Sequence, residues 1–125
     1  MNLEQPTTNL EILGQEITKM AEADQDMRHR AQANNGIIET EEDDKVDSIN
    51  TTRMKEIVEA IGWPGKSRVG EETAHVAWLL VQHADHDVVF QKKCLDLMKN
   101  LPEGEVSPKD LAYLETNSQI KSITI

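Results

Sequence analysis

The chain has 125 residues, of which 38% are hydrophobic, 29% charged and 3% aromatic. This size and composition predict one soluble domain, residues 1–125, whose core is built from aliphatic side chains. The formal net charge of -10 excludes non-specific nucleic-acid binding, because such binding depends on Lys and Arg side chains that displace counterions.

The N-terminal stretch "MNLEQPTTNLEIL" lacks the basic and long apolar regions of a signal peptide. The chain has no apolar run near the length of a membrane span, so we expect no membrane partner and a cytoplasmic protein. Cys94 is the single cysteine and cannot form an internal disulfide.

The first helix is predicted from a capping box, "TNLE" at Thr8–Glu11, and extends to about Ala33. Its apolar stripe continues past Met20 onto Asp24. A carboxylate on a core face must be paired, because its desolvation costs several kcal/mol, and Arg28 at i+4 can reach it. This pair is either a structural ion pair or part of a functional site.

The stretch "ANNGIIETEEDDKVDS" has a Gly turn followed by a run of acids, which favours a solvated acidic loop at residues 34–46. Asp47 or Ser48 is then predicted to cap a second helix, which Gly62 ends. Asn50 and Arg53 lie at the edge of the inner face of this helix. They are either solvated or members of a site.

The third helix is expected to begin near Gly70, and from Val76 to Val81 it is apolar on every side. This predicts a central helix that other helices surround. Gln82 and His83 follow directly, so at least one of them should be desolvated and hydrogen-bonded, with Asp24 or Arg53 as partner. His83 is either a satisfied core histidine or a site residue.

Asp87 is predicted to cap a fourth helix that runs to about Asn100, and Ser107 with Pro108 to open a short helix ending near Glu115. The tail, residues 116–125, is either an edge strand or irregular. The predicted fold class is all-α: a compact single domain of four to five helices around a central apolar helix.

No metal site is predicted. His83 and His86 are spaced i, i+3, but two ligands are fewer than a zinc site requires. The common hydrolase, nucleotide-binding and redox motifs do not occur, so no cofactor is expected. His86 follows the predicted break in the helix and should be exposed and dispensable.

Four motifs carry a resemblance to an uncharacterised bacterial family, a domain of unknown function: "ADQDMR", "DSINTTRMKEIVEAIGWPGKSRVG", "AHVAWLLVQHADHDVVFQ" and "DLAYL". The resemblance covers most of the chain from Asp24 onward and implies an all-helical domain but no activity. It also implies that the motif residues gather in one place: Asp24, Gln25, Arg28, Asp47, Asn50, Arg53, Trp63, Gly70, Gln82, His83 and Gln91.

The C-terminus departs from this pattern. Members of the family continue after the "AYL" motif with Asp-Arg and finish on a Gln-rich Tyr-Gly segment. Here Glu115-Thr116-Asn117 follows, and the chain ends in "QIKSITI". If that tail completes the family's site, the site is altered in this chain.

Two hypotheses about function remain open. In the first, the protein is a small polar-ligand-binding domain or an enzyme, with His83 as a general base oriented by Asp24 or Asp47 and with arginines that hold an anion. The ligand-binding residues would be Arg28, Asp47, Asn50, Arg53, Gln82 and Gln91. In the second, the same residues form a structural polar network in a protein–protein interaction module with an acidic surface.

Overall fold

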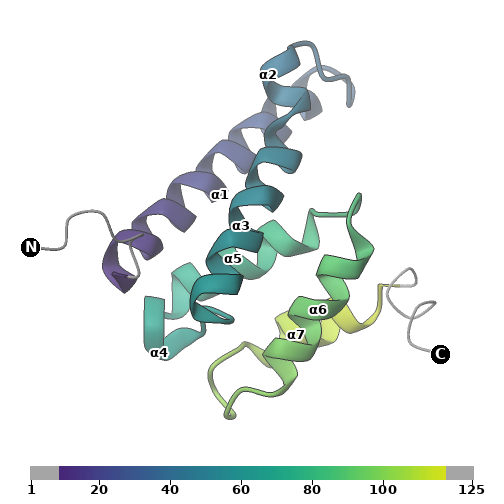
Figure 1. Cartoon of the computed structure of the whole chain (residues 1–125). Coiled ribbons are helices and arrows are strands. Elements are labelled where there is room, and N and C mark those ends of the chain that lie inside the picture. The colour runs from purple at the N-terminus through teal and green to yellow at the C-terminus, as the bar shows by residue number, and fades with distance from the viewer. Residues whose placement is uncertain (1–8, 118–125) are drawn as a thin grey trace, which may run out of the picture.

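The computed structural model describes residues 9–117, and these residues form seven helices and no strand (Figure 1). The predicted all-helical class is therefore confirmed for this part of the chain. The end of the tail, where an edge strand was one expectation, lies outside the described residues. The helices are α1 (Leu10–Ala33), α2 (Glu41–Asp44), α3 (Val46–Ile61), α4 (Lys66–Val69), α5 (Glu71–Gln82), α6 (Val88–Lys99) and α7 (Pro108–Glu115).

The N-cap of α1 is Asn9, not Thr8 as the capping box predicts. The Asn9 side chain accepts hydrogen bonds from the backbone N–H groups of Glu11 and Ile12, at 2.9 and 3.2 Å. Asn is as good an N-cap as Ser, because its short side chain reaches the same unpaired amides. Thr8 itself lies outside the described residues.

Two short helices, α2 and α4, exceed the predicted number of four to five. Part of the predicted acidic loop, Glu41–Asp44, forms the single turn of α2, and the Thr40 hydroxyl accepts a hydrogen bond from the Asp43 N–H at 3.0 Å. Each of these helices has four residues. A single turn is too short to carry a helical period in the sequence.

The prediction that Asp47 or Ser48 caps the second helix is wrong. The helix, α3, begins at Val46, and its N-cap Lys45 makes no capping hydrogen bond through its side chain. Asp47 lies in the first turn, where its carboxylate binds Arg28 of α1. The Asp47 carboxylate therefore binds the guanidinium of Arg28 and does not cap the backbone N–H groups at the start of α3.

Other predicted helix ends are confirmed. Gly62 follows α3 with a φ of 75°, which favours glycine. The Asp87 carboxylate caps α6 by accepting a hydrogen bond from the Phe90 N–H at 3.1 Å. Pro108 occupies the first turn of α7 after Ser107, although the Ser107 side chain makes no capping bond.

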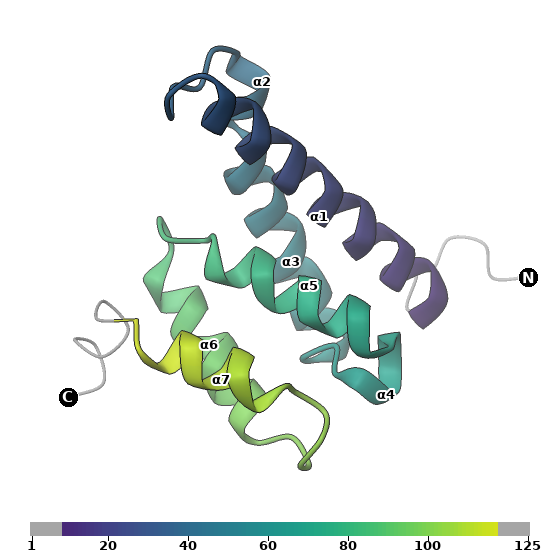
Figure 2. The same ribbon diagram turned by 180° about the vertical axis from the view of Figure 1, so that it is seen from behind.

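Helices α1 and α3 lie side by side, and α6 and α7 form a second pair (Figures 1 and 2). Helix α5 contacts α1, α3, α4, α6 and α7. Its Ala77 and Val81 are fully buried. None of the helices described in residues 9–117 is both long enough and apolar enough to cross a membrane. Helix α5 therefore contacts both pairs. The turn at its C-terminus carries His83, whose side chain contacts Asp24 of α1.

Candidate polar site at the end of helix α5

Asp24 is the buried centre of a polar cluster. Its residue is 0% exposed on the core side of α1, in line with its place on the apolar stripe. The two carboxylate oxygens lie 3.0 and 2.9 Å from Nδ1 of His83. Arg28 Nε lies 3.2 Å from Oδ1, and Gln25 Nε2 donates to Oδ2 at 2.9 Å. Three side chains therefore compensate the desolvation of one carboxylate.

The geometry around Asp24 determines which His83 nitrogen carries the proton. Arg28 Nε also lies 3.0 Å from His83 Nδ1, but one nitrogen cannot both donate to Asp24 and accept from Arg28. A carboxylate only accepts hydrogen bonds, so Nδ1 must be protonated, and the Arg28 Nε–H is left to Asp24 Oδ1. The other ring nitrogen, Nε2, has no hydrogen-bond partner within the described chain. The His83 side chain is 24% exposed.

Asp47 of α3 is the last member of the cluster and binds Arg28. Arg28 Nη2 donates to both of its carboxylate oxygens, at 2.9 and 3.0 Å. The Arg28 and Asp47 side chains are 34% and 33% exposed, so this ion pair contributes less than a buried one. Its role is geometric, because it holds the guanidinium between α1 and α3 and fixes the Nε–H against Asp24.

The pKa of Asp24 is lower than its ordinary value of 3.8. Burial alone would raise this pKa, but the hydrogen bond and positive charge of His83, the charge of Arg28 and the hydrogen bond from Gln25 together outweigh burial. The carboxylate is therefore ionised at neutral pH, as an acceptor for Nδ1–H requires.

This lowered pKa predicts how stability depends on pH. The folded protein binds the Asp24 proton less tightly than the unfolded chain does. Its stabilising contribution is therefore complete above the ordinary pKa of 3.8 and is lost as the pH falls through the folded-state value. We expect the stability difference between the parent and Asp24→Asn, measured by urea unfolding, to shrink as the pH falls below about 4. A difference that stays constant into the acid range would contradict the ion pairing.

The turn that carries His83 is held by Gln91 of α6. Gln91 is 0% exposed, and its Nε2 donates to the backbone carbonyls of Val81 and Gln82 at 3.0 and 3.3 Å. The carbonyls at the end of a helix have no partner within that helix. Gln91 satisfies two of them and also lies 3.3 Å from Asp85. It therefore fixes the end of α5 and does not reach Asp24.

Gln82 does not join the cluster either. Its Oε1 is buried and has no hydrogen-bond partner, and the same is true of Trp78 Nε1 one turn earlier. Of the two residues expected to face Asp24, the structure brings His83 to it.

Asn50 and Arg53 lie outside the cluster. Asn50 is 7% exposed, and its Nδ2 donates to the Met20 carbonyl at 3.1 Å. Arg53 binds Glu16 of α1, with Nη2 at 2.8 Å from Oε1, and Glu56 of its own helix at 2.9 Å. Both residues join α1 to α3, and no hydrogen bond links either of them to His83.

Gln25 lies beside the apolar stripe, so the helical period does not predict its contact with Asp24, but the resemblance to the family places the two residues together. A second pair, His75 and Asp110, was not predicted. His75 Nδ1 lies 2.8 Å from Asp110 Oδ2, and its ring stacks on Trp78 with centroids 5.3 Å apart. It joins α5 to α7 and is separate from Asp24.

Two further side chains can be placed. His86 is exposed beyond the end of α5, as expected. Burial raises the pKa of the Cys94 thiol to about 12, so this cysteine is not a thiolate at neutral pH. Among residues 9–117, no group of three His, Cys, Asp or Glu side chains is placed to hold a metal ion.

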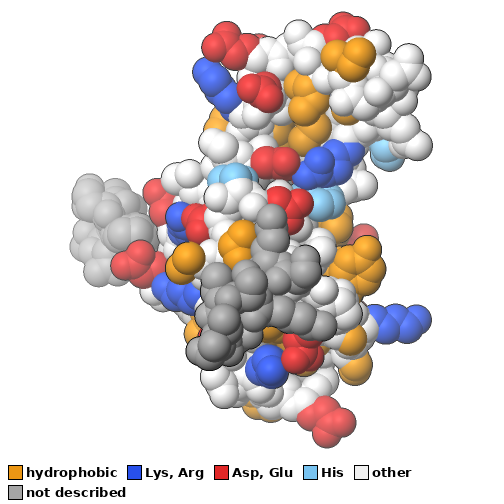
Figure 3. Space-filling model, turned by 90° about the vertical axis from the view of Figure 1, so that its right-hand side faces the viewer, with side chains coloured by type: hydrophobic (Ala, Val, Ile, Leu, Met, Phe, Trp, Pro, Cys, Tyr) orange, Lys and Arg blue, Asp and Glu red, His pale blue; other side chains and the backbone are white. Residues whose placement is uncertain are grey.

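Charged side chains of both signs and histidines adjoin one another across the middle of one face of the molecule (Figure 3).

Comparison with known proteins gives one match. A family model described as "Family of unknown function (DUF6624)" matches residues 11–121. This agrees with the family of unknown function that the sequence motifs predict. No curated protein and no solved structure matches the chain significantly.

Proposed function

We propose that this chain, which belongs to the DUF6624 family of unknown function, binds a small polar ligand at the end of α5 and that His83 acts there as a general base. One observation carries the proposal. The buried carboxylate of Asp24 holds Nδ1 of His83, while Nε2 has no partner in the described part of the chain. An aspartate in this position fixes the imidazole tautomer and stabilises the imidazolium that forms when Nε2 takes a proton.

The proposed step is a proton transfer. Nε2 of His83 accepts a proton from a water molecule or from a hydroxyl group of the ligand, which makes that oxygen nucleophilic. The positive charge on the ring is then balanced by Asp24, and Gln25 and Arg28 keep the carboxylate ionised and oriented. Hydrolysis and transfer to a hydroxyl group are the reaction classes that need such a base.

The charge of the cluster favours a neutral ligand over the anion expected from the sequence. Asp24 and Asp47 carry two negative charges, and Arg28 carries one positive charge. With His83 neutral, the cluster is therefore net negative. Arg28 already donates to both carboxylates, and Arg53 is engaged with Glu16 and Glu56. A neutral hydroxyl or amide group of a ligand can bind here without an unpaired arginine.

The experiment compares His83→Ala with His86→Ala. Turnover would be assayed on 4-nitrophenyl acetate and 4-nitroacetanilide, an uncharged ester and an uncharged amide, as simple hydrolytic probes. We expect His83→Ala to lower turnover by about 100-fold or more, the usual contribution of a general base, and His86→Ala to leave it unchanged. A rate that does not change in His83→Ala would contradict the proposal.

Unfolding of the same two variants must be measured, so that the assays use folded protein. His83→Ala leaves Asp24 without its main donor and should cost about 1 to 3 kcal/mol. His86→Ala should stay within about 0.5 kcal/mol of the parent, because the side chain is exposed. Equal losses would show that His83 is not the residue bound in the cluster.

The second candidate function is a protein-interaction module in which the cluster is structural. The observation that favours it is the exposure of two neighbouring apolar residues, Ile37 at 60% and Ile38 at 43%, just before the acidic turn Glu41–Asp44. Under this candidate, His83→Ala would lower stability and leave turnover of every probe unchanged.

A further inference from the structure

A cavity of about 320 Å³ lies between α4, the start of α5 and the loop that joins α6 to α7. This volume is at the lower end of the range for small-molecule sites. The His75–Asp110 pair lines the cavity together with apolar side chains, among them Trp63 and Pro108. None of these residues belongs to the Asp24 cluster, so the cavity is a separate place for a ligand.

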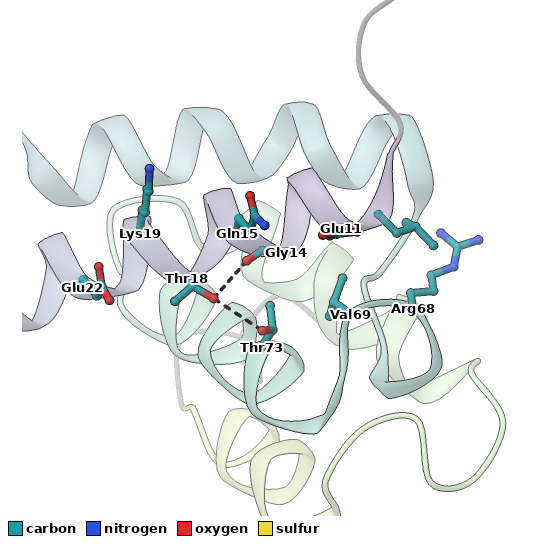
Figure 4. Close-up of a pocket in the computed structure, with 10 residues that line it drawn as sticks. Glu11, Gly14, Gln15, Thr18, Lys19, Glu22, Arg68, Val69 and Thr73 are labelled. Atoms are coloured by element: carbon teal, nitrogen blue, oxygen red, sulfur yellow. Dashed lines mark hydrogen bonds between the residues drawn. The ribbon is translucent and has the colours of Figure 1, made fainter.

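The walls of the cavity are held in place by the protein itself. Helix α4 packs against α1, where Val69 and Gly14 line the same groove (Figure 4). The loop between α6 and α7 is tied to α4 by Glu105, whose carboxylate accepts hydrogen bonds from the N–H and the hydroxyl of Ser67, at 2.9 and 3.0 Å. A side chain at Gly65 would prevent this contact, because its Cβ would lie 2.6 Å from Glu105 Oε1. The cavity is therefore preformed.

Two buried residues of the lining have polar atoms without a partner. Trp63 is 3% exposed, and its indole N–H donates to no acceptor within residues 9–117. Asp110 is 6% exposed; its Oδ2 accepts from His75 Nδ1 at 2.8 Å, and its Oδ1 has no partner in the same part of the chain. Neither atom is fully enclosed, in contrast to Trp78 Nε1. One donor and one acceptor are therefore left open where these residues line the cavity.

Unpaired polar groups on buried residues are few in native proteins, because each one costs free energy unless water or a ligand satisfies it. We propose that this cavity binds a small uncharged molecule that carries a primary amide group. The amide carbonyl would accept from Trp63 Nε1, and the amide N–H would donate to Asp110 Oδ1. The rest of the molecule would lie on the apolar part of the lining, Ala74, Val106 and Pro108.

The charges around the cavity favour an uncharged occupant. Glu71, Glu105 and Asp110 are negative, and among the described residues of the lining Lys66 is the only cation when His75 is neutral. Lys66 already lies 3.8 Å from Glu71. A carboxylate ligand would be repelled and has no N–H for Asp110 Oδ1, and an ammonium group has no acceptor for the indole N–H. An amide has both groups and no charge.

Benzamide is a suitable probe, with binding followed in ¹H–¹⁵N correlation spectra. The chain has two tryptophans and therefore two indole N–H signals. We expect benzamide to move the signal of Trp63 and to leave that of Trp78, whose Nε1 is enclosed, in place. Benzoate, which is charged and has no N–H, and acetophenone, which keeps only the carbonyl, should each bind at least about 10-fold more weakly.

Variants test the donor directly, with affinities taken from backbone amide shifts in the loop before α7. Trp63→Phe keeps an aromatic ring but removes the N–H, so it should bind benzamide about 10-fold more weakly. Trp78→Phe is the matched control and should keep the affinity of the parent. His83→Ala should keep it too, because this site does not depend on the proposed base.

Thermal melts show whether each variant is folded, and if Trp63→Phe is not, the Trp63 signal of the parent protein decides. The proposal is overturned if benzamide does not move that signal, or if benzoate or acetophenone binds as tightly as benzamide. It is also overturned if either control variant loses as much affinity as Trp63→Phe.

Discussion

Replacing Asp24 with Ala should lower the free energy of unfolding by about 2 to 4 kcal/mol. The substitution removes a fully buried carboxylate and leaves His83 Nδ1 and Gln25 Nε2 without their acceptor. Breaking a fully buried ion pair typically costs about 3 to 5 kcal/mol. The loss here should be somewhat smaller, because Arg28 is 34% exposed and keeps Asp47 as a partner.

Urea unfolding at neutral pH measures this loss, and Asp26→Ala is the matched control. Asp26 is an exposed aspartate two positions further along the same helix, so its replacement should change stability by no more than about 0.5 kcal/mol. Similar losses in the two variants would mean that the Asp24 contacts contribute little to stability.

Replacing Gln91 with Ala should also cost about 2 to 4 kcal/mol. The side chain is fully buried, so its removal leaves a cavity, and the Val81 and Gln82 carbonyls lose a donor. The Val81 carbonyl also accepts from the Ala84 N–H at 3.0 Å, so most of the polar loss falls on Gln82. The turn that carries His83 would lose its link to α6.

The control for this variant is Gln32→Ala, an exposed glutamine in α1 that should change stability by no more than about 0.5 kcal/mol. Gln91→Leu keeps most of the volume and separates the cavity from the lost hydrogen bonds. If Gln91→Leu is as stable as the parent, the hydrogen bonds to the end of α5 are not what holds this turn.

Features that depend on local sequence were predictable. The caps at Asp87 and Gly62 follow from which side chains can satisfy or terminate a helix end. The burial of Asp24 follows from the helical period, since a stripe that includes Ile17 and Met20 must reach it one turn later. The pairing of Asp24 with Arg28 was also predictable, because residues spaced i, i+4 lie on the same face of a helix.

Features that depend on the register between helices were not predictable. Arg53 was expected to be able to face His83, but it binds Glu16, because the alignment of α3 along α1 places these two side chains opposite each other. Asp47 is a good capping residue by type, yet Arg28 from another helix binds its carboxylate. One sequence contains no signal for such alignments.

Gln82 and His83 combine a feature that was predictable from local sequence with one that was not. The all-round apolar run indicated that at least one of them would be desolvated. Which of the two meets Asp24 depends on where α5 ends, and His83 is its C-cap, with its backbone N–H bound to the Leu79 carbonyl at 3.0 Å. The short helix α4 had no detectable period, because it has four residues.

The central claim is that Asp24 holds His83 as the Nδ1–H tautomer and leaves Nε2 open. Long-range ¹H–¹⁵N correlation spectra of the histidine side chains, recorded at a pH where His83 is neutral, test this claim most directly. We predict that Nδ1 of His83 is protonated and Nε2 is not, and that Asp24→Asn weakens this preference. A neutral His83 protonated at Nε2 in the parent protein would contradict the account.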